Sequence, residues 1–198
     1  MITIGLTGGI ATGKSTVATI LRESLNVPVI DADQVSRDVV ALGTPGLAEL
    51  VSEFGPDILR TDGALDRKKL GEIVVSDKSA RRRLERLTHP LIREEIEARL
   101  LALNSAGAAV AVVEAALLVE TGSYRLYDHL IVVSAAPAVQ LARLMARENL
   151  SEPQAQQWLD TQLPLERKEA VATVVIRNDG DLQALEAATL AAWETLEF

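Results

Sequence analysis

A glycine-rich stretch near the start of the chain constrains its fold more than any other feature. Residues 8–15 read Gly-Gly-Ile-Ala-Thr-Gly-Lys-Ser and match the pattern G-x-x-x-x-G-K-[ST]. An apolar run at residues 2–6 precedes them, and a helical pattern begins near Thr16. A strand, a glycine-rich turn and a helix N-terminus in this order form the context in which the pattern binds phosphate. This context disfavours the alternative, a plain turn that carries a surface lysine.

Each residue type in this phosphate loop (residues 8–15) suits an anionic ligand. Gly8 and Gly13 let the backbone approach a ligand with no Cβ in the way. Backbone N–H groups at a helix N-terminus, together with the helix dipole, favour an anion. Lys14 supplies a positive charge for the β- and γ-phosphates, and the Ser15 hydroxyl can hold Mg²⁺. The sequence therefore predicts a nucleoside triphosphate site.

The composition limits the partners of such a site. The 198 residues carry a net charge of −8, which repels a phosphate polymer over most of the surface. Aromatic residues make up only 3% of the chain, too few to stack on bases. The sequence has no cysteine, which excludes disulfides, thiolate zinc sites and a cysteine nucleophile. We therefore expect small-molecule partners and no nucleic acid.

The hydropathy pattern predicts no membrane segment. The longest apolar run, residues 108–119, is interrupted by Glu114 and is too short to cross a bilayer. The first residues lack a basic region and already form the predicted strand, so we expect no signal peptide. We therefore expect no membrane partner and a cytoplasmic location. We also expect a monomer or weak homo-oligomer.

Predicted strands alternate with predicted helices. The apolar runs that predict strands are residues 2–6, 27–30, 109–113, 129–133 and 174–176. The periodic patterns that predict helices are residues 15–25, 34–40, 45–54, most of 66–106, 138–148, a helix from 151, and 181–197. Thr44 with Pro45, and Ser151 with Gln154, are expected to cap helices, and Pro90 is expected to start a new helix with Thr88 or His89 near its cap.

Long crossovers between these strands predict an α/β fold. We expect a P-loop NTPase-type parallel β-sheet sandwiched by helices, in a single domain over residues 1–198. The mainly helical block at about 60–105 is expected to be an inserted substrate subdomain that binds the acceptor. The segment at about 143–168, broken by Pro153 and Pro164, is expected to form a lid.

Polar residues follow several predicted strands, where ligands bind in open α/β sheets. They are Asp31, Asp33, Glu114 and Asn178. One carboxylate of the Asp-Ala-Asp triplet can accept the proton of an attacking hydroxyl, and the other can hold metal-bound water. Either aspartate can instead cap the following helix. We favour catalysis for Asp33 and leave both roles open for Asp31.

Glu114 interrupts an apolar run at the end of a predicted central strand. A buried carboxylate there needs a partner, because an unpaired buried charge is costly. Mg²⁺, bound directly or through water, is one candidate, and a salt bridge to an arginine is the other.

Gln140, Arg143 and Arg147 fall on one face of a predicted helix, opposite a mostly apolar face. They can form a solvated surface, or they can belong to the lid and neutralise charge during phosphoryl transfer. His89 can bind a ligand or cap its helix, whereas His129, at the start of a strand, is expected to be structural.

Several segments together resemble the dephospho-coenzyme A kinase family. The matching residues are the run from Leu6 to Thr16, Asp31-Ala32-Asp33 with Arg37, His89-Pro90-Leu91-Ile92, Leu117-Leu118-Val119-Glu120, Arg143, Arg147, Gln162 and Arg177-Asn178-Asp179-Gly180. The order and spacing of these segments are specific and extend over nearly the whole chain.

The resemblance implies that ATP phosphorylates the ribose 3′-hydroxyl of dephospho-coenzyme A, the last step of coenzyme A synthesis, with Mg²⁺ as the metal ion. It implies that Asp33 is the base and that Lys14 and Arg143 are also catalytic. It implies that Asp33, Arg37 and His89 bind the acceptor, and that Ser15 and Glu114 bind the metal. The residues implied to bind the nucleotide are Gly9, Ala11, Thr12, Gly13, Lys14, Ser15, Thr16, Arg143, Arg147 and Asn178.

The chain departs from the family pattern at one place. Such kinases usually carry Asp, an apolar residue and Pro before the Leu117-Leu118 pair, where this chain has Glu114-Ala115-Ala116. A longer acidic side chain and a missing proline would move the carboxylate and loosen the turn. The metal role of Glu114 therefore has less support than that of Ser15.

Two other functions fit the phosphate loop. One is another hydroxyl kinase, acting on a nucleoside, a nucleotide or a sugar acid. The other is a nucleotide-dependent switch or assembly protein that only binds the triphosphate. The His89-Pro90 element and the Asp-Ala-Asp triplet argue against a switch, which needs no acceptor site.

Overall fold

The computed structural model describes residues 1–196, which separate into two compact units. The first unit contains residues 1–30 and 103–196, and the second contains residues 31–102. The second unit includes residues 60–102 of the helical block expected from the sequence, and it also includes the residues before them, from Asp31 onward.

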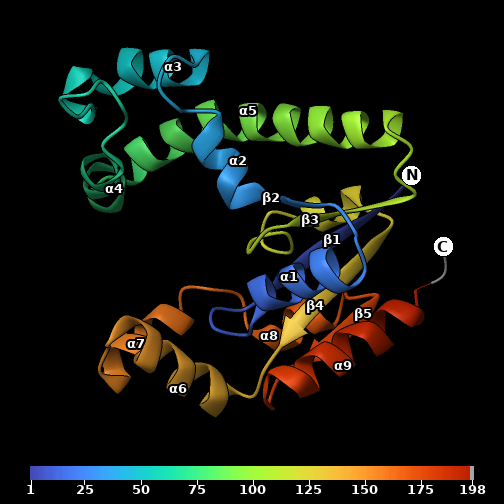
Figure 1. The fold of residues 1–198 in the computed structure, drawn as a ribbon. Helices are drawn as coiled ribbons and strands as arrows, with labels where there is room; N and C mark the ends of the chain where they lie inside the picture. Colours follow the sequence, from blue (N-terminus) through green and yellow to red (C-terminus); the bar gives the residue numbers. More distant parts are fainter. Residues whose placement is uncertain (197–198) are drawn as a thin grey trace. The chain divides into compact units, whose positions relative to one another are not determined.

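The first unit is built on a parallel five-stranded sheet in the order β2-β3-β1-β4-β5 (Figure 1). β1 lies in the centre, paired in parallel with β3 and β4, and β4 pairs in parallel with β5. The strands are β1 (Ile2–Gly8), β2 (Val29–Asp31), β3 (Val110–Glu114), β4 (His129–Ser134) and β5 (Val174–Arg177). The predicted α/β fold with a parallel sheet is confirmed.

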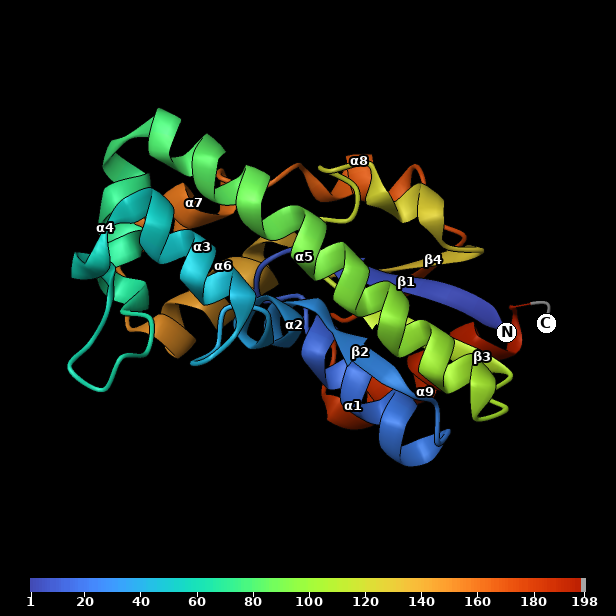
Figure 2. The same ribbon diagram turned by 90° about the horizontal axis from the view of Figure 1, so that it is seen from above.

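Helices cover both faces of this sheet. On one face, α1 (Lys14–Ser24) and α9 (Leu182–Glu194) pack side by side against the strands (Figure 1). On the other side of β1 and β4 lies α8 (Leu165–Glu169), as Figure 2 shows. The largest buried cluster lies under α1 and α9 and contains Ile4, Leu6, Val17, Ala18, Ile20, Leu21, Val27, Val112, Ile131, Val133, Ile176, Leu185, Ala192 and Leu196.

Three further helices complete the first unit. The 3₁₀ helix η2 (Ser123–Leu126) precedes β4, and α6 (Pro137–Glu148) follows it. α6 contacts α7 (Glu152–Leu159), which begins with the capping box predicted for Ser151 and Gln154. No helix within residues 1–196 has both the length and the apolar character that a membrane span requires.

The strand register brings polar strand ends to one edge of the sheet. Leu6 of β1 lies level with Glu114, the last residue of β3. The backbone N–H of Asn178, just after β5, donates to the carbonyl of Ser134, the last residue of β4, at 2.8 Å. The phosphate loop, Glu114 and Asn178 therefore share the carboxyl edge of the sheet, where ligands bind in open α/β folds.

The second unit is helical. Its helices are α2 (Ala32–Asp38), α3 (Pro45–Phe54), the 3₁₀ helix η1 (Pro56–Ile58), α4 (Arg67–Ser76) and α5 (Lys78–Ser105). Thr44 caps α3, with Pro45 as the first helical residue, as predicted. Arg99 donates to Asp38 at 2.7 Å and lowers the pKa of that carboxyl. The buried apolar cluster contains Val40, Leu47, Leu50, Ile58, Leu65 and Leu70.

The prediction that Pro90 starts a new helix is wrong, because α5 continues through it. Proline has no N–H to donate, so the carbonyl of Arg86 loses its helical partner. Arg86 and Pro90 are both exposed, so water can bond to that carbonyl without interrupting the helix. The C-terminal helix predicted for residues 181–197 is α9, and residue 197 lies outside the described residues.

Candidate active site

The phosphate loop turns from β1 into α1 through two residues with positive φ. They are Ala11, at 59°, and Gly13, at 91°. Residues in this conformation point successive backbone N–H groups into a concavity that suits an anion. A Cβ on Gly8 would lie 2.6 Å from the carbonyl oxygen of Val133, so only glycine fits there against β4. The loop is thus an anion-binding turn at a helix N-terminus, as the sequence predicts.

Glu114 contacts two polar side chains of the phosphate loop, those of Lys14 and Ser15. Its Oε1 accepts hydrogen bonds from Lys14 Nζ at 2.6 Å and from Ser15 Oγ at 3.0 Å. The Glu114 side chain is only 5% exposed, and Arg22 Nη2 lies 3.9 Å from its other oxygen. The buried carboxylate therefore has the partner that its burial requires, and the nearer cation is the phosphate-loop lysine.

The Ser15 hydroxyl and the Glu114 carboxylate fit a magnesium ion. Both supply the hard oxygen ligands that Mg²⁺ prefers, and the two oxygens lie 3.0 Å apart. Residues 1–196 contain no cluster of three or more His, Cys, Asp or Glu side chains that could hold a metal alone. An ion here would take its other ligands from water and from nucleotide phosphates, which is how proteins usually hold magnesium.

Buried side chains from three other segments donate to backbone carbonyls of the phosphate loop. The donors come from α6, from α8 and from the turn after β5, and each is at most 7% exposed. The bonds are Lys168 Nζ to the Gly8 carbonyl at 3.2 Å, Gln140 Nε2 to the Ile10 carbonyl at 2.8 Å, and Asn178 Nδ2 to the Thr12 carbonyl at 2.8 Å.

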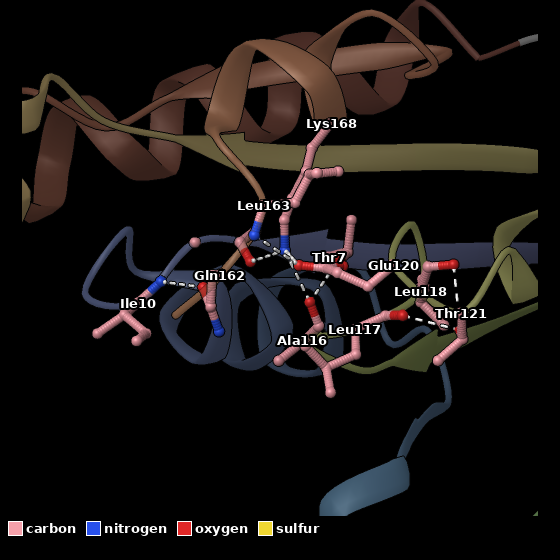
Figure 3. Close-up of polar contacts among 12 residues, drawn as sticks. Thr7, Ile10, Ala116, Leu117, Leu118, Glu120, Thr121, Gln162, Leu163 and Lys168 are labelled. Carbon is pink, nitrogen blue, oxygen red and sulfur yellow. Dashed lines mark hydrogen bonds and ion pairs between the residues drawn. The ribbon is translucent and has the colours of Figure 1, made fainter. Parts of the chain in front are cut away.

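Lys168 is fully buried and surrounded by acceptors (Figure 3). Besides the Gly8 carbonyl, its ammonium reaches the Ala116 carbonyl at 2.9 Å and Glu120 Oε1 at 2.7 Å. Glu120 also accepts from the backbone N–H of Leu163 at 3.4 Å. Lys168 therefore ties the start of the phosphate loop to the segment after β3, and Glu120 adds the segment before α8.

Gln140 is turned inward, so the predicted polar face of its helix is not a solvated surface at this position. Gln140 is buried beside Leu144, whereas Arg147, expected on the same face, is exposed. The inward turn is stable because the Gln140 amide bonds to the Ile10 carbonyl. Gln162 Oε1 accepts from the N–H of Ile10 at 3.0 Å (Figure 3). Two glutamines, Gln140 and Gln162, therefore hold Ile10.

Arg143 bonds to the turn after β5. Its Nη1 donates to the Asn178 carbonyl at 2.8 Å, and its Nη2 donates to Asn178 Oδ1 at 3.3 Å and to the Gly180 carbonyl at 3.1 Å. These bonds orient the Asn178 amide so that its N–H faces Thr12. Arg147 lies further along α6 and pairs with its neighbour Glu148 at 2.9 Å.

Thr16 lies in the first turn of α1, and the predicted acceptor residues and Asp31 lie in the second unit. Asp31 Oδ1 accepts from the backbone N–H groups of Asp33 and Gln34, so Asp31 caps α2, one of its two expected roles. Asp33 follows in the first turn of α2 and is exposed. Arg37 lies in the last turn of α2, and His89 is exposed within α5 rather than at a helix cap.

A family model described as dephospho-CoA kinase matches residues 2–184. The chain belongs to the dephospho-CoA kinase family. Proteins named dephospho-CoA kinase from Geobacter sulfurreducens and Moorella thermoacetica are 49% and 46% identical to it. The matches cover 96% and 100% of this chain and 96% and 93% of those proteins. The kinase function predicted from the sequence is thereby confirmed at the level of the family.

Solved structures support the same assignment. TT1252 from Thermus thermophilus superimposes with a TM-score of 0.82 at 33% identity, covering 100% of this chain and 98% of its own. A dephospho-CoA kinase from Campylobacter jejuni has a TM-score of 0.68 at 29% identity, with 97% and 95% covered. A shikimate kinase from Bacteroides thetaiotaomicron, with a TM-score of 0.56 and 17% identity, shares the fold. The predicted P-loop NTPase-type fold is confirmed.

The structure shows how this member of the dephospho-CoA kinase family accommodates Glu114-Ala115-Ala116. The longer glutamate still reaches Lys14 and Ser15. The Ala116 carbonyl accepts from Lys168 and also from Thr7 Oγ1 at 3.1 Å (Figure 3). These two hydrogen bonds hold the turn at the place where the sequence lacks a proline.

Proposed function

We propose that this chain transfers the γ-phosphoryl group of ATP to the ribose 3′-hydroxyl of dephospho-coenzyme A, giving coenzyme A and ADP. The observation that carries the proposal is the meeting of Lys14, Ser15 and Glu114 at the phosphate loop in a chain of this family. Lys14 and Ser15 are suited to a triphosphate and its metal ion, and the carboxylate that ends β3 completes the site.

The phosphate loop and Lys14 bind the triphosphate in this proposal, with Gly9, Ala11, Thr12, Gly13 and Thr16 contributing through the backbone. Ser15 and Glu114 hold Mg²⁺, which when bound neutralises phosphate charge. Glu114 also keeps the Lys14 ammonium at the loop, since the two groups lie 2.6 Å apart. The side chains of Lys14 and Glu114 are therefore placed before the nucleotide binds, which reduces the cost of ordering them.

Asp33 serves as the base that accepts the proton of the acceptor hydroxyl. Its exposed position in the first turn of α2 supports this role, because its neighbour Asp31 already supplies the helix cap. Arg37 and His89 bind the acceptor from the same unit, and both are exposed. The helical block at about 60–105 forms the acceptor subdomain.

The segment at about 143–168 acts as the lid. Arg147 is exposed, and its surface pair with Glu148 is weak enough to give way to a phosphate group. Arg143 contributes to the nucleotide site through Asn178, which it orients. Lid closure excludes water, which would otherwise hydrolyse ATP. The cytoplasmic location and the monomer or weak homo-oligomer expected from the sequence belong to this proposal.

ADP release with and without dephospho-coenzyme A tests the proposal. We expect ADP only when dephospho-coenzyme A is present, in a one-to-one ratio with coenzyme A. A panel of nucleosides, nucleotides and sugar acids should give no ADP above background. ADP release with another acceptor would show that the substrate is not dephospho-coenzyme A. Slow ADP release without any acceptor would favour a nucleotide switch. Lys14→Ala should abolish release in every case, which excludes a contaminating enzyme.

A further inference from the structure

Three buried donors hold alternate carbonyls of the phosphate loop. Gly8, Ile10 and Thr12 are two residues apart, and each of their carbonyls accepts from a side chain outside the loop. The donors belong to three different segments, around residues 140, 168 and 178, and each lies at least 130 residues after the carbonyl that it binds. Each donor thus needs the correct fold of its own segment to reach the loop.

Because the peptide bond is planar, the direction of each loop carbonyl fixes the direction of the next N–H group. In a trans peptide the C=O of one residue and the N–H of the next point in opposite directions. No cis peptide bond occurs among residues 1–196. A donor that draws the Ile10 carbonyl outward therefore aims the Ala11 N–H inward, and the bond to the Thr12 carbonyl does the same for the Gly13 N–H. Both amides belong to the anion-binding turn, with Ala11 and Gly13 at positive φ.

Two glycines leave room for these donors. A Cβ on Gly9 would lie 2.7 Å from Gln140 Nε2. A Cβ on Gly13 would collide with Asn178 Nδ2, and the positive φ of Gly13 disfavours any other residue. The missing side chains of Gly9 and Gly13 thus leave room for the donors on the outer side of the loop, as well as for a phosphate on the inner side.

We propose that Gln140, Asn178 and Lys168 are positioning residues that fix the polarity of the phosphate loop. They keep the carbonyl oxygens of Gly8, Ile10 and Thr12, which would repel phosphate, on the outside of the loop, so that the N–H groups of the residues that follow them face inward. This inference deepens the proposed function, since it rests on the loop binding a nucleotide. It does not depend on the identity of the acceptor.

Lys168 has a second part in this arrangement. Its ion pair with Glu120 lies beside the contact between Gln162 and the Ile10 N–H (Figure 3). A buried ammonium is costly unless its N–H groups all have partners, and here three acceptors lie within 3.2 Å of the Lys168 nitrogen. Lys168 therefore couples the root of the phosphate loop to the C-terminal end of the proposed lid.

Isosteric variants of the full chain test the proposal. Gln140→Glu and Asn178→Asp each replace a donor by an oxygen of the same shape that faces a loop carbonyl. Lys168→Met removes the third donor at similar length. Gln183→Glu, an exposed change in the first turn of α9, is the matched control. ADP binding is measured by calorimetry without any acceptor, and the amide resonances of Ala11 and Gly13 are followed by NMR as ADP is added.

We expect Gln140→Glu and Asn178→Asp each to weaken ADP binding by about tenfold, since one donor is lost and an acceptor is left unpaired. On binding ADP, Gln140→Glu should reduce the amide shift of Ala11 most, and Asn178→Asp that of Gly13. The control should match the wild type. A purely structural role would lower the melting temperature and change both amides alike, and that result would overturn the proposal.

Wild-type ADP affinity in folded Gln140→Glu and Asn178→Asp would also overturn the proposal. Lys168→Met removes a buried charge pair and can unfold the protein. If this variant melts cooperatively, weaker ADP binding supports the proposal. Gln140→Glu and Asn178→Asp test the proposal whether or not Lys168→Met folds. Because the assay contains no acceptor, a failure of the kinase assignment to dephospho-coenzyme A would leave this result standing.

Discussion

Lys14 Nζ lies 2.6 Å from Glu114 Oε1, so the lysine of the phosphate loop is held by the last residue of β3. The same oxygen accepts from Ser15 Oγ. One carboxylate thus places the side chains of both Lys14 and Ser15. A buried charge pair of this kind contributes geometry more than stability, because desolvation offsets most of its attraction.

Glu114→Gln should weaken magnesium binding at the site. The variant keeps the shape of the side chain but loses the charge that holds Lys14 and attracts the ion. We expect kcat/KM for ATP to fall about 10- to 100-fold, with a higher Mg²⁺ concentration at half-maximal rate. Initial rates over a magnesium titration measure both quantities.

Two further variants serve as controls. Glu114→Asp keeps the charge and should lose less of kcat/KM, and Glu23→Gln, on the exposed side of α1, should change neither quantity. An unchanged magnesium dependence in Glu114→Gln would remove Glu114 from the metal site.

Gly8→Ala and Gly9→Ala should fail in different ways. At Gly8 the new Cβ meets the backbone carbonyl of Val133 at 2.6 Å, which cannot move freely, so we expect about 1–3 kcal/mol lower stability. At Gly9 the Cβ meets the end of the Gln140 side chain, which can move but then loses its bond to the Ile10 carbonyl. Gly9→Ala should therefore melt almost normally and bind ADP about tenfold more weakly. Urea unfolding and calorimetry separate the two effects. Equal behaviour of the two variants would contradict this assignment.

Tyr127 should limit stability at alkaline pH. Burial raises its pKa to about 12 from the ordinary value of 10.0, because the charged phenolate is disfavoured beside Leu118, Leu130 and Val132. Its contribution is fully present below pH 10 and is lost as the pH rises toward 12, since only the unfolded chain ionises in that interval. Stability should fall by at most about 1.4 kcal/mol per pH unit from this group. Urea midpoints between pH 9 and 12 should fall less steeply in Tyr127→Phe than in the wild type or in Tyr124→Phe.

The parts of the site that depend on local pattern were predictable from the sequence. The phosphate loop is recognisable because its residue types, the strand before it and the helix after it all occur within one short stretch of the sequence. The strand ends that carry Glu114 and Asn178 follow from the rule that parallel strands end at a common edge. These predictions needed no knowledge of distant packing.

The positioning donors were not predictable by the same means. Helical periodicity assigns Gln140 to a polar face, and it gives no sign that a carbonyl 130 residues earlier will satisfy a buried amide. Lys168 lies in a short polar helix, where a lysine is normally exposed. The continuation of α5 through Pro90 was not predictable either. It depends on whether water reaches the Arg86 carbonyl, which helical periodicity does not indicate. Gln162 was found only through the family resemblance.

Asp33→Asn tests the central claim, that the acceptor hydroxyl is deprotonated by Asp33 while the phosphate loop holds ATP. The variant removes the proposed base and changes no residue of the phosphate loop. Asp31→Asn is the matched control, because asparagine caps a helix as well as aspartate does. The measurement is single-turnover transfer to dephospho-coenzyme A, alongside calorimetric ATP binding. The account predicts that Asp33→Asn binds ATP like the wild type and transfers at least about 100-fold more slowly, while Asp31→Asn transfers normally. Transfer at the wild-type rate by Asp33→Asn would contradict it.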